Sequence, residues 1–122
     1  MTLVTGVDFT IIPTKDIDKA VDFYENVLGL ERSKQWGEMP AHEFETGNLT
    51  IALVDMSAFG QEFSPHRAPI AFRVDDVPAA RAELESRGVQ FRGDTIDSGV
   101  CHQAIFEDPD GNALDIHHRY AP

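Results

Sequence analysis

A carboxylate and an imidazole lie two residues apart near the C-terminus, at Asp115 and His117. The segment Ala113 to His118 follows turn residues and is predicted to be a β-strand, in which residues i and i+2 point to the same face. Asp115 and His117 therefore share a face and can act together as acid–base groups. We take them as the candidate catalytic pair. A purely structural hydrogen bond between the two side chains would explain the same spacing.

Other histidines and the single cysteine, Cys101, could also carry chemistry. His102 follows Cys101 directly, but adjacent strand residues point to opposite faces, so the two cannot hydrogen-bond as nucleophile and base. His102 alone remains a candidate for ligand binding, and the sequence does not decide which face it takes. His42 and His66 could join His102 in an unusual metal site; solvated loop or strand positions are the alternative explanation.

The first part of the chain predicts a strand followed by a helix. Val7 to Thr14 is rich in β-branched and aromatic residues, which favour a strand. Asp16 suits the N-cap of a helix that ends at Gly29. Apolar residues at intervals of three and four predict one buried face of this helix: Ile17, Ala20, Val21, Tyr24 and Leu28.

The same order of signals returns about sixty residues later. Ile70 to Val74 alternates as a strand does, Asp76 suits an N-cap, and Pro78 falls in the first turn of the helix, where its missing N–H costs nothing. Gly88 predicts the end of this second helix. Asp16 and Asp76 are thus equivalent positions of an internal repeat.

Each half continues with alternating segments, a Gly-Asn turn and a last strand. The turns are Gly47-Asn48 and Gly111-Asn112. We therefore predict an α+β fold made of two βαβββ repeats, about 5–56 and about 67–120, within a single domain over residues 1–122.

Charge and cysteine content exclude several classes of function. The 122 residues include 10 Lys and Arg against 21 Asp and Glu, a net charge of −11, which repels nucleic acids and anionic membranes. A single cysteine excludes an intramolecular disulfide and fits a reducing compartment. No apolar run approaches membrane-spanning length. We expect a soluble cytoplasmic protein.

Three motifs make the sequence resemble the vicinal oxygen chelate superfamily, which includes glyoxalases, bleomycin-resistance proteins and dioxygenases. The resemblance covers essentially the whole chain. The matching stretches are Asp16-Ile17-Asp18-Lys19-Ala20 with Phe23-Tyr24 and Val27-Leu28-Gly29-Leu30, Ala71-Phe72-Arg73-Val74-Asp75-Asp76-Val77, and Phe106-Glu107-Asp108-Pro109-Asp110-Gly111-Asn112. The last stretch is the most specific, because its tight turn needs the backbone geometry of Pro and Gly.

This resemblance implies a fold and a kind of site. The two curled sheets would form a cup-shaped mixed sheet that holds a small molecule, and short chains of this family are expected to form homodimers. In metal-dependent members the ligands come from the first and last strands of each half, and they are usually His, Gln or Glu.

Transferring those ligand positions to this sequence leaves almost no metal ligand. Counting back from Asp16 and Asp76 assigns the first-strand positions to Phe9 and Pro69, and counting four residues on from Gly47 and Gly111 assigns the last-strand positions to Ile51 and Asp115. A lone carboxylate does not hold a catalytic divalent ion, because three or more protein donors are normally needed. We predict no metal and no other cofactor.

The remaining cup residues would be largely apolar. By strand alternation Ile11 joins Phe9, and Arg73 joins Asp115 and His117, while aromatic residues such as Trp36 and Phe59 lie in connecting segments, where they could stack on a ligand. The expected ligand-binding residues are Phe9, Ile11, Trp36, Ile51, Pro69, Arg73, His102, Asp115 and His117.

Such a cup suits an apolar or aromatic small molecule. The leading hypothesis is a binding protein of the bleomycin-resistance or sequestration kind, without metal. The alternative is an enzyme of the superfamily, such as a glyoxalase-like lyase or isomerase or a dioxygenase, that uses Asp115 and His117 as acid–base groups or a rearranged metal site.

Overall fold

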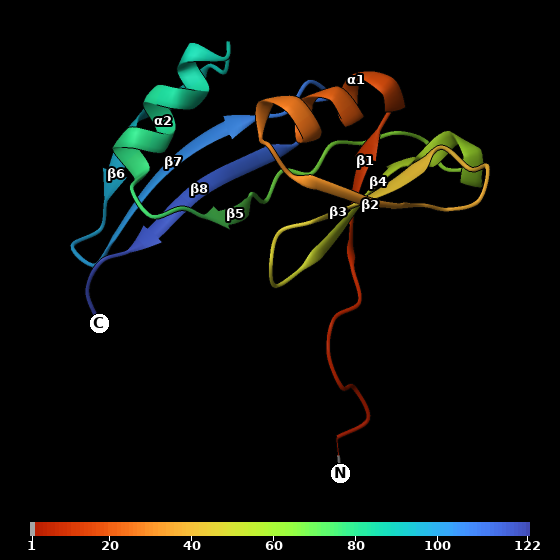
Figure 1. Cartoon of the computed structure of the whole chain (residues 1–122), viewed down its shortest axis with the longest axis horizontal. Helices are drawn as coiled ribbons and strands as arrows, with labels where there is room; N and C mark the ends of the chain where they lie inside the picture. The colour runs from red at the N-terminus through yellow and green to blue at the C-terminus, as the bar shows by residue number, and fades with distance from the viewer. Residues whose placement is uncertain (1) are drawn as a thin grey trace. The chain divides into compact units, whose positions relative to one another are not determined.

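The computed structural model describes residues 2–122, which form two compact units (Figure 1). The first unit ends at Ser64 and the second spans Pro65–Pro122. The first contains β1 (Thr10–Thr14), α1 (Ile17–Asp22), the π-helix η1 (Phe23–Val27), β2 (Glu31–Gln35), β3 (Ala41–Glu45), β4 (Thr50–Asp55) and the 3₁₀-helix η2 (Met56–Phe59). The second contains β5 (Ile70–Arg73), α2 (Val77–Ser86), β6 (Phe91–Asp97), β7 (Cys101–Glu107) and β8 (Ala113–Arg119).

Each unit has a four-stranded mixed sheet, and the two sheets have the same topology. The strand orders are β1-β4-β3-β2 and β5-β8-β7-β6. The first strand pairs in parallel with the last one, and the other pairs are antiparallel. These sheets and their helices confirm the predicted α+β class and its βαβββ order.

Both predicted helix N-caps are confirmed. The Asp16 carboxylate accepts a hydrogen bond from the Lys19 N–H (3.2 Å), and the Asp76 carboxylate accepts one from the Ala79 N–H (2.9 Å). Neither helix has the length and apolar character needed to cross a membrane, nor does any other helix within residues 2–122.

Two elements differ from their predicted form. The first strand begins at Thr10 rather than Val7, because its pairing with β4 begins at Thr10. The first helix is α-helical only to Asp22 and continues as η1, in which the Leu28 N–H bonds to the Phe23 carbonyl (3.0 Å). This wider turn keeps Tyr24 buried against the sheet.

In each unit the helical segment covers one face of the sheet. The Tyr24 ring of η1 lies 6.3 Å from the ring of Phe44 on β3, and Phe44 is paired with Ile51 on β4. In the second unit, Arg81 of α2 lies over the ring of Phe91, 4.8 Å from its centroid. Phe91 in turn packs on Phe106 (5.1 Å between centroids). We call the opposite face of each sheet its helix-free face.

A buried polar network shapes the turn between β7 and β8. The Asp108 carboxylate accepts hydrogen bonds from the backbone N–H groups of Asp110 and Asn112 (both 2.9 Å) and from the Asn112 amide (2.8 Å). The Asn112 Oδ1 in turn accepts from the His66 N–H (2.7 Å), and the Ala113 N–H donates to the His66 carbonyl (3.0 Å). The network therefore fixes the segment leading into β5 beside the start of β8.

Asn112→Ala is expected to lower the free energy of unfolding by about 3 kcal/mol, because it leaves the His66 N–H and the buried Asp108 carboxylate short of partners. Urea unfolding followed by circular dichroism measures this change. Asn48→Ala, in the exposed Gly-Asn turn of the first unit, is the matched control and should cost less than about 0.5 kcal/mol. Equal effects of the two substitutions would contradict the importance of the network.

Candidate functional site

The helix-free face of the first unit is apolar at its centre. Ile11 and Glu43 both pair with Ala52, so these three residues share a face, opposite to Phe44 and Ile51. Ala52 belongs to a small buried apolar cluster with Ala41 and Val54. The partly buried side chains of Ile11, Trp36 and Met56 pack against this cluster. As the alternation predicts, Ile11 lies on this face.

Three aromatic side chains meet at this face and form what we call the aromatic cluster: Phe9, Trp36 and Phe59. Both phenylalanine rings meet the Trp36 indole edge to face, at 5.2 Å for Phe9 and 6.5 Å for Phe59. The Trp36 Nε1 donates a short hydrogen bond to the Glu43 carboxylate (2.6 Å). Phe9 and Phe59 are 40% and 46% exposed. The cluster thus combines a fixed indole with two accessible aromatic rings.

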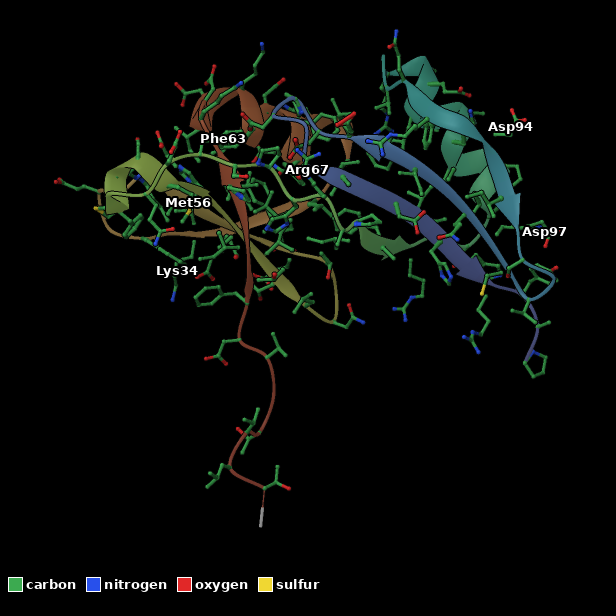
Figure 2. The ribbon with its side chains drawn as sticks, turned by 180° about the vertical axis from the view of Figure 1, so that it is seen from behind. Lys34, Met56, Phe63, Arg67, Asp94 and Asp97 are labelled. Carbon is green, nitrogen blue, oxygen red and sulfur yellow. The ribbon has the colours of Figure 1, made fainter. Side chains whose placement is uncertain are left out.

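Phe63 does not belong to the aromatic cluster, although it lies only a few residues after Phe59. Its ring instead contacts the Lys15 ammonium, 5.5 Å from the centroid. Figure 2 labels Phe63 and also Met56, at the start of η2. The long connection between β4 and β5, from Met56 to Pro69, begins with the helical turn η2, and Phe59 is the last residue of this turn.

The helix-free face of the second unit is polar. Ala71 pairs with Asp115 and Arg73 with His117, and on the other side of β8 Ile105 pairs with Asp115. Paired residues point to the same side, so Arg73, Asp115 and His117 share this face as predicted. Arg73 is exposed and His117 is partly buried, whereas Asp115 is only 3% exposed.

Asp115 has the most perturbed environment of the candidate residues. Burial raises the pKa of its carboxyl from the ordinary 3.8 to about 6, and the positive charge of His117 and the backbone of Ala104 oppose this rise. Its Oδ1 atom is buried and has no hydrogen-bond partner within residues 2–122. A carboxyl in this state can accept or donate a proton near neutral pH.

Ile51 is a correction. It was expected at the position equivalent to Asp115, but its pairing with Phe44 puts it on the face covered by η1. The equivalent of Asp115 is Ala52, because Ala52 pairs with Ile11 just as Asp115 pairs with Ala71. Ala52, like Ile51, has no metal-binding atom.

His102 is a second correction, because it lies on the other face of its sheet from Asp115. It pairs with His118 and alternates with Phe106, on the side of the sheet that α2 covers. Its Nε2 is 3.3 Å from the Asp97 Oδ2, and its ring is 4.6 Å from that of Tyr120.

Pro69, another of the expected ligand-binding residues, is exposed just before β5.

Sequence reasoning missed Glu43 as the residue that fixes the Trp36 indole. It also missed the contact between Asp97 and Tyr120, whose hydroxyl donates to the Asp97 carboxylate (2.7 Å). Strand alternation indicates that Glu43 and its neighbour His42 point to opposite faces of the sheet. Which of the two faces Glu43 takes is decided only by the register of β3 against β4.

The comparison with known families agrees with this architecture. The model of the Glyoxalase/Bleomycin resistance protein/Dioxygenase superfamily matches residues 6–116. The chain belongs to this superfamily. Its solved structures include TnmS3, an antibiotic binding protein from Streptomyces sp. CB03234, which is 28% identical, with a TM-score of 0.81 over 98% of this chain and 99% of that one.

Two lactoylglutathione lyases of the superfamily are also similar. The enzyme from Schizosaccharomyces pombe is 28% identical over 88% of this chain, but the chain spans only 45% of that enzyme's length. The lyase from Agrobacterium tumefaciens is 18% identical and has a TM-score of 0.78 over 93% of both chains, a likeness of fold alone.

The metal site of metal-dependent members does not fit this chain. Of the four equivalent positions, Phe9, Pro69 and Ala52 have no donor atom, and only Asp115 has one. Within residues 2–122 no three His, Cys, Asp or Glu side chains lie close enough together to hold a metal ion. His66 and His102 of the second unit belong to no such group, and neither does His42 within the first unit.

Asp115→Asn is expected to stabilise the protein at pH 7. The folded state keeps the Asp115 proton where the unfolded chain has released it, so stability falls as the pH rises from about 4 to about 6 and then stays level. The difference between 3.8 and about 6 corresponds to roughly 3 kcal/mol, the most that the substitution can restore.

Urea unfolding across this pH range measures the effect. Asp94→Asn, which removes an exposed carboxylate from β6, controls for the loss of one negative charge. If Asp115→Asn gives the same pH profile as Asp94→Asn, Asp115 is not the strained carboxyl described above.

Proposed function

We propose that the chain is a binding protein of the bleomycin-resistance or sequestration kind, which takes a flat aromatic small molecule on the helix-free face of its first unit. The observation that carries the proposal is the aromatic cluster. Its two phenylalanine rings both contact the indole of Trp36 and are partly exposed, and Trp36 packs against the apolar cluster of Ala41, Ala52 and Val54. A ligand ring placed there would gain aromatic contacts and bury apolar area.

The hydrogen bond between Trp36 and Glu43 supports this role. The indole is held in one orientation before any ligand arrives, so binding loses little side-chain freedom at this position.

The similarity to TnmS3 supports a binding role. That protein is described as antibiotic binding and aligns with this chain over nearly its whole length. The lack of donor atoms at Phe9, Pro69 and Ala52 supports the same conclusion, because it removes the metal chemistry of the metal-dependent members.

Planar aromatic antibiotics and dyes are expected to quench the fluorescence of Trp36, the only tryptophan of the chain, and to raise the melting temperature. Phe59→Ala should weaken binding about fivefold or more, because one aromatic contact is lost. Phe63→Ala is the matched control, since Phe63 contacts Lys15 instead of the cluster. A panel without any saturable quenching, or equal effects of the two variants, would contradict the proposal.

A second candidate function is an enzyme that works by acid–base catalysis without metal. Asp115 favours it, because its pKa of about 6 suits proton transfer near neutral pH. His117 and Arg73 lie on the same face, where the imidazole can exchange a proton and the guanidinium can hold an anionic substrate group.

The two candidates differ in turnover and in their response to substitution. The acid–base enzyme predicts lactoylglutathione lyase or related isomerase activity that resists chelators and falls at least about a hundredfold in Asp115→Asn. Steady-state assays with and without a chelator, with Asp94→Asn as control, measure this. An activity that survives Asp115→Asn unchanged excludes the acid–base role, and one that chelators abolish points to a metal.

A further inference from the structure

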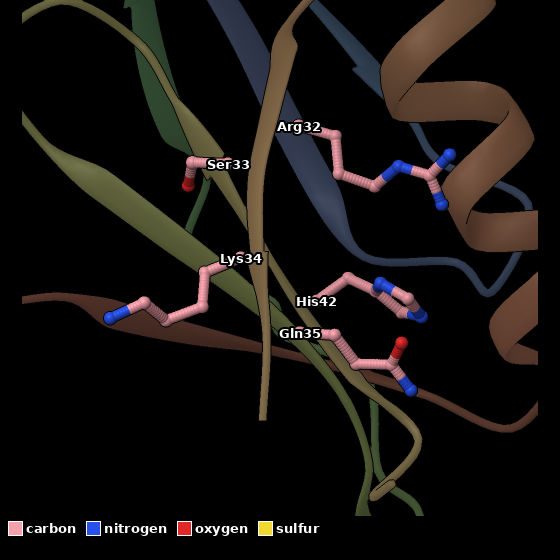
Figure 3. Close-up of a pocket in the computed structure, with 5 residues that line it drawn as sticks. All are labelled: Arg32, Ser33, Lys34, Gln35 and His42. Atoms are coloured by element: carbon pink, nitrogen blue, oxygen red, sulfur yellow. The ribbon is translucent and has the colours of Figure 1, made fainter. Parts of the chain in front are cut away.

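A polar pocket lies at the β2 edge of the first unit's sheet. It has a volume of about 260 Å³ and is lined by Arg32, Ser33, Lys34, Gln35 and His42. Figure 3 shows the side chains of Arg32, Gln35 and His42 extending to one side of β2 and β3, while that of Lys34 extends to the other. The pocket therefore gathers three different hydrogen-bonding side chains at the edge of the sheet.

An irregularity in β2 brings these side chains together. Arg32 pairs with Phe44 and Gln35 with His42, and the register shifts between Arg32 and Lys34. In a regular strand, residues three apart point to opposite faces; the extra residue puts Arg32 and Gln35 on the same one. Both lie on the side of Phe44, which is the side of α1 and η1.

The second unit fills the equivalent place with apolar side chains. Phe106 is the equivalent of Phe44, and its partner on β6 is Phe91, where the first unit has Arg32. The equivalent of His42 is Ala104, which is fully buried and pairs with Ile116. The first unit thus has an arginine and a histidine where the duplicated fold packs a phenylalanine and an alanine. Polar residues at these positions bury less apolar area than phenylalanine and alanine do. Such a loss of packing is expected where the polar groups bind a ligand.

The contacts of Arg32 leave it suited to an anion. Its Nε donates to the Glu25 carboxylate of η1 (3.0 Å), which orients a guanidinium whose side chain is 43% exposed. A guanidinium has five N–H donors and binds planar oxyanions through two of them, so one carboxylate does not exhaust it. Burial, and then the charge of Arg32, lower the pKa of His42 below its ordinary value, although Asp18 and Glu25 act in the opposite direction.

We propose that this pocket binds the carboxylate or phosphate group of a small molecule, with Arg32 as the main anchor and His42 and Gln35 as further hydrogen-bonding groups. The net charge of −11 disfavours a polyanion such as a nucleic acid, so the partner is a small anion. Because Arg32, Gln35 and His42 lie on the face of the sheet opposite to the aromatic cluster, the proposal does not depend on the aromatic ligand.

The histidine ring signals in NMR spectra test this proposal. Inorganic phosphate and sodium acetate are titrated separately at constant ionic strength, so that the two arms distinguish phosphate from carboxylate recognition. At least one anion should shift the His42 ring signals saturably, and the other four of the five histidines should not follow the same curve. Arg32→Gln should weaken binding about tenfold or more, because a charge-assisted contact is lost.

Two further variants make the test specific. Glu25→Gln removes the carboxylate that competes for Arg32 and should strengthen binding severalfold. Arg92→Gln is the matched control: Arg92 is an exposed arginine of β6 that likewise pairs with one carboxylate, that of Glu107 (3.1 Å). Figure 2 labels Asp94 and Asp97, the acidic residues farther along that strand.

Two results would overturn the proposal. One is the absence of a saturable His42 response in both the unmodified protein and Glu25→Gln. The other is an Arg92→Gln variant that weakens the response as much as Arg32→Gln does, because the effect would then reflect overall charge and not the pocket.

Discussion

The parallel pairing of the first strand with the last strand of each unit decides which side chains reach the helix-free faces. Ile11 is held beside Ala52, and Ala71 beside Asp115. A slip of one residue would turn every side chain of β4 or β8 to the other face, and in β8 it would place Asp115 and His117 under α2. The apolar residues that pack under the helical segments, such as Tyr24 with Phe44, make such a slip costly. The aromatic cluster and the position of Asp115 both depend on this register.

Local signals predicted the elements well, and counting across a turn failed. The N-caps at Asp16 and Asp76 depend on one residue and its backbone neighbours, so they were predictable. Ile51 was misassigned because the two Gly-Asn turns differ in length. Thr46 and Leu49 close the first turn (N···O 3.2 Å), whereas Asp108 and Asn112, one residue farther apart, close the second (3.0 Å). The second closing residues are Leu49 and Asn112, and the residues three positions after them, Ala52 and Asp115, are equivalent.

Contacts between distant segments were beyond what the sequence alone could predict. Phe9, Trp36 and Phe59 come from three separate segments, and their hydrophobic character predicted neither that they meet nor that Glu43 would fix the indole. The face of His102 depended in the same way on its register with His118, which no local pattern fixes. By contrast, Asp115 and His117 were placed correctly on one face with Arg73, because alternation within a strand is a local property.

The two units share one topology but differ in the chemistry of their helix-free faces. On the helix-free faces the carboxylates occupy exchanged positions: the first unit has Glu43 beside Ala52, and the second has Ile105 beside Asp115. Glu43 is satisfied by the Trp36 indole, whereas the buried Oδ1 of Asp115 has no partner within residues 2–122. A buried carboxylate oxygen without a donor costs stability, and a proton or a donor group on a bound molecule removes that cost. Taken separately, the helix-free face of the first unit is suited to contact apolar groups, and that of the second unit to distinguish molecules by protonation state and hydrogen bonding.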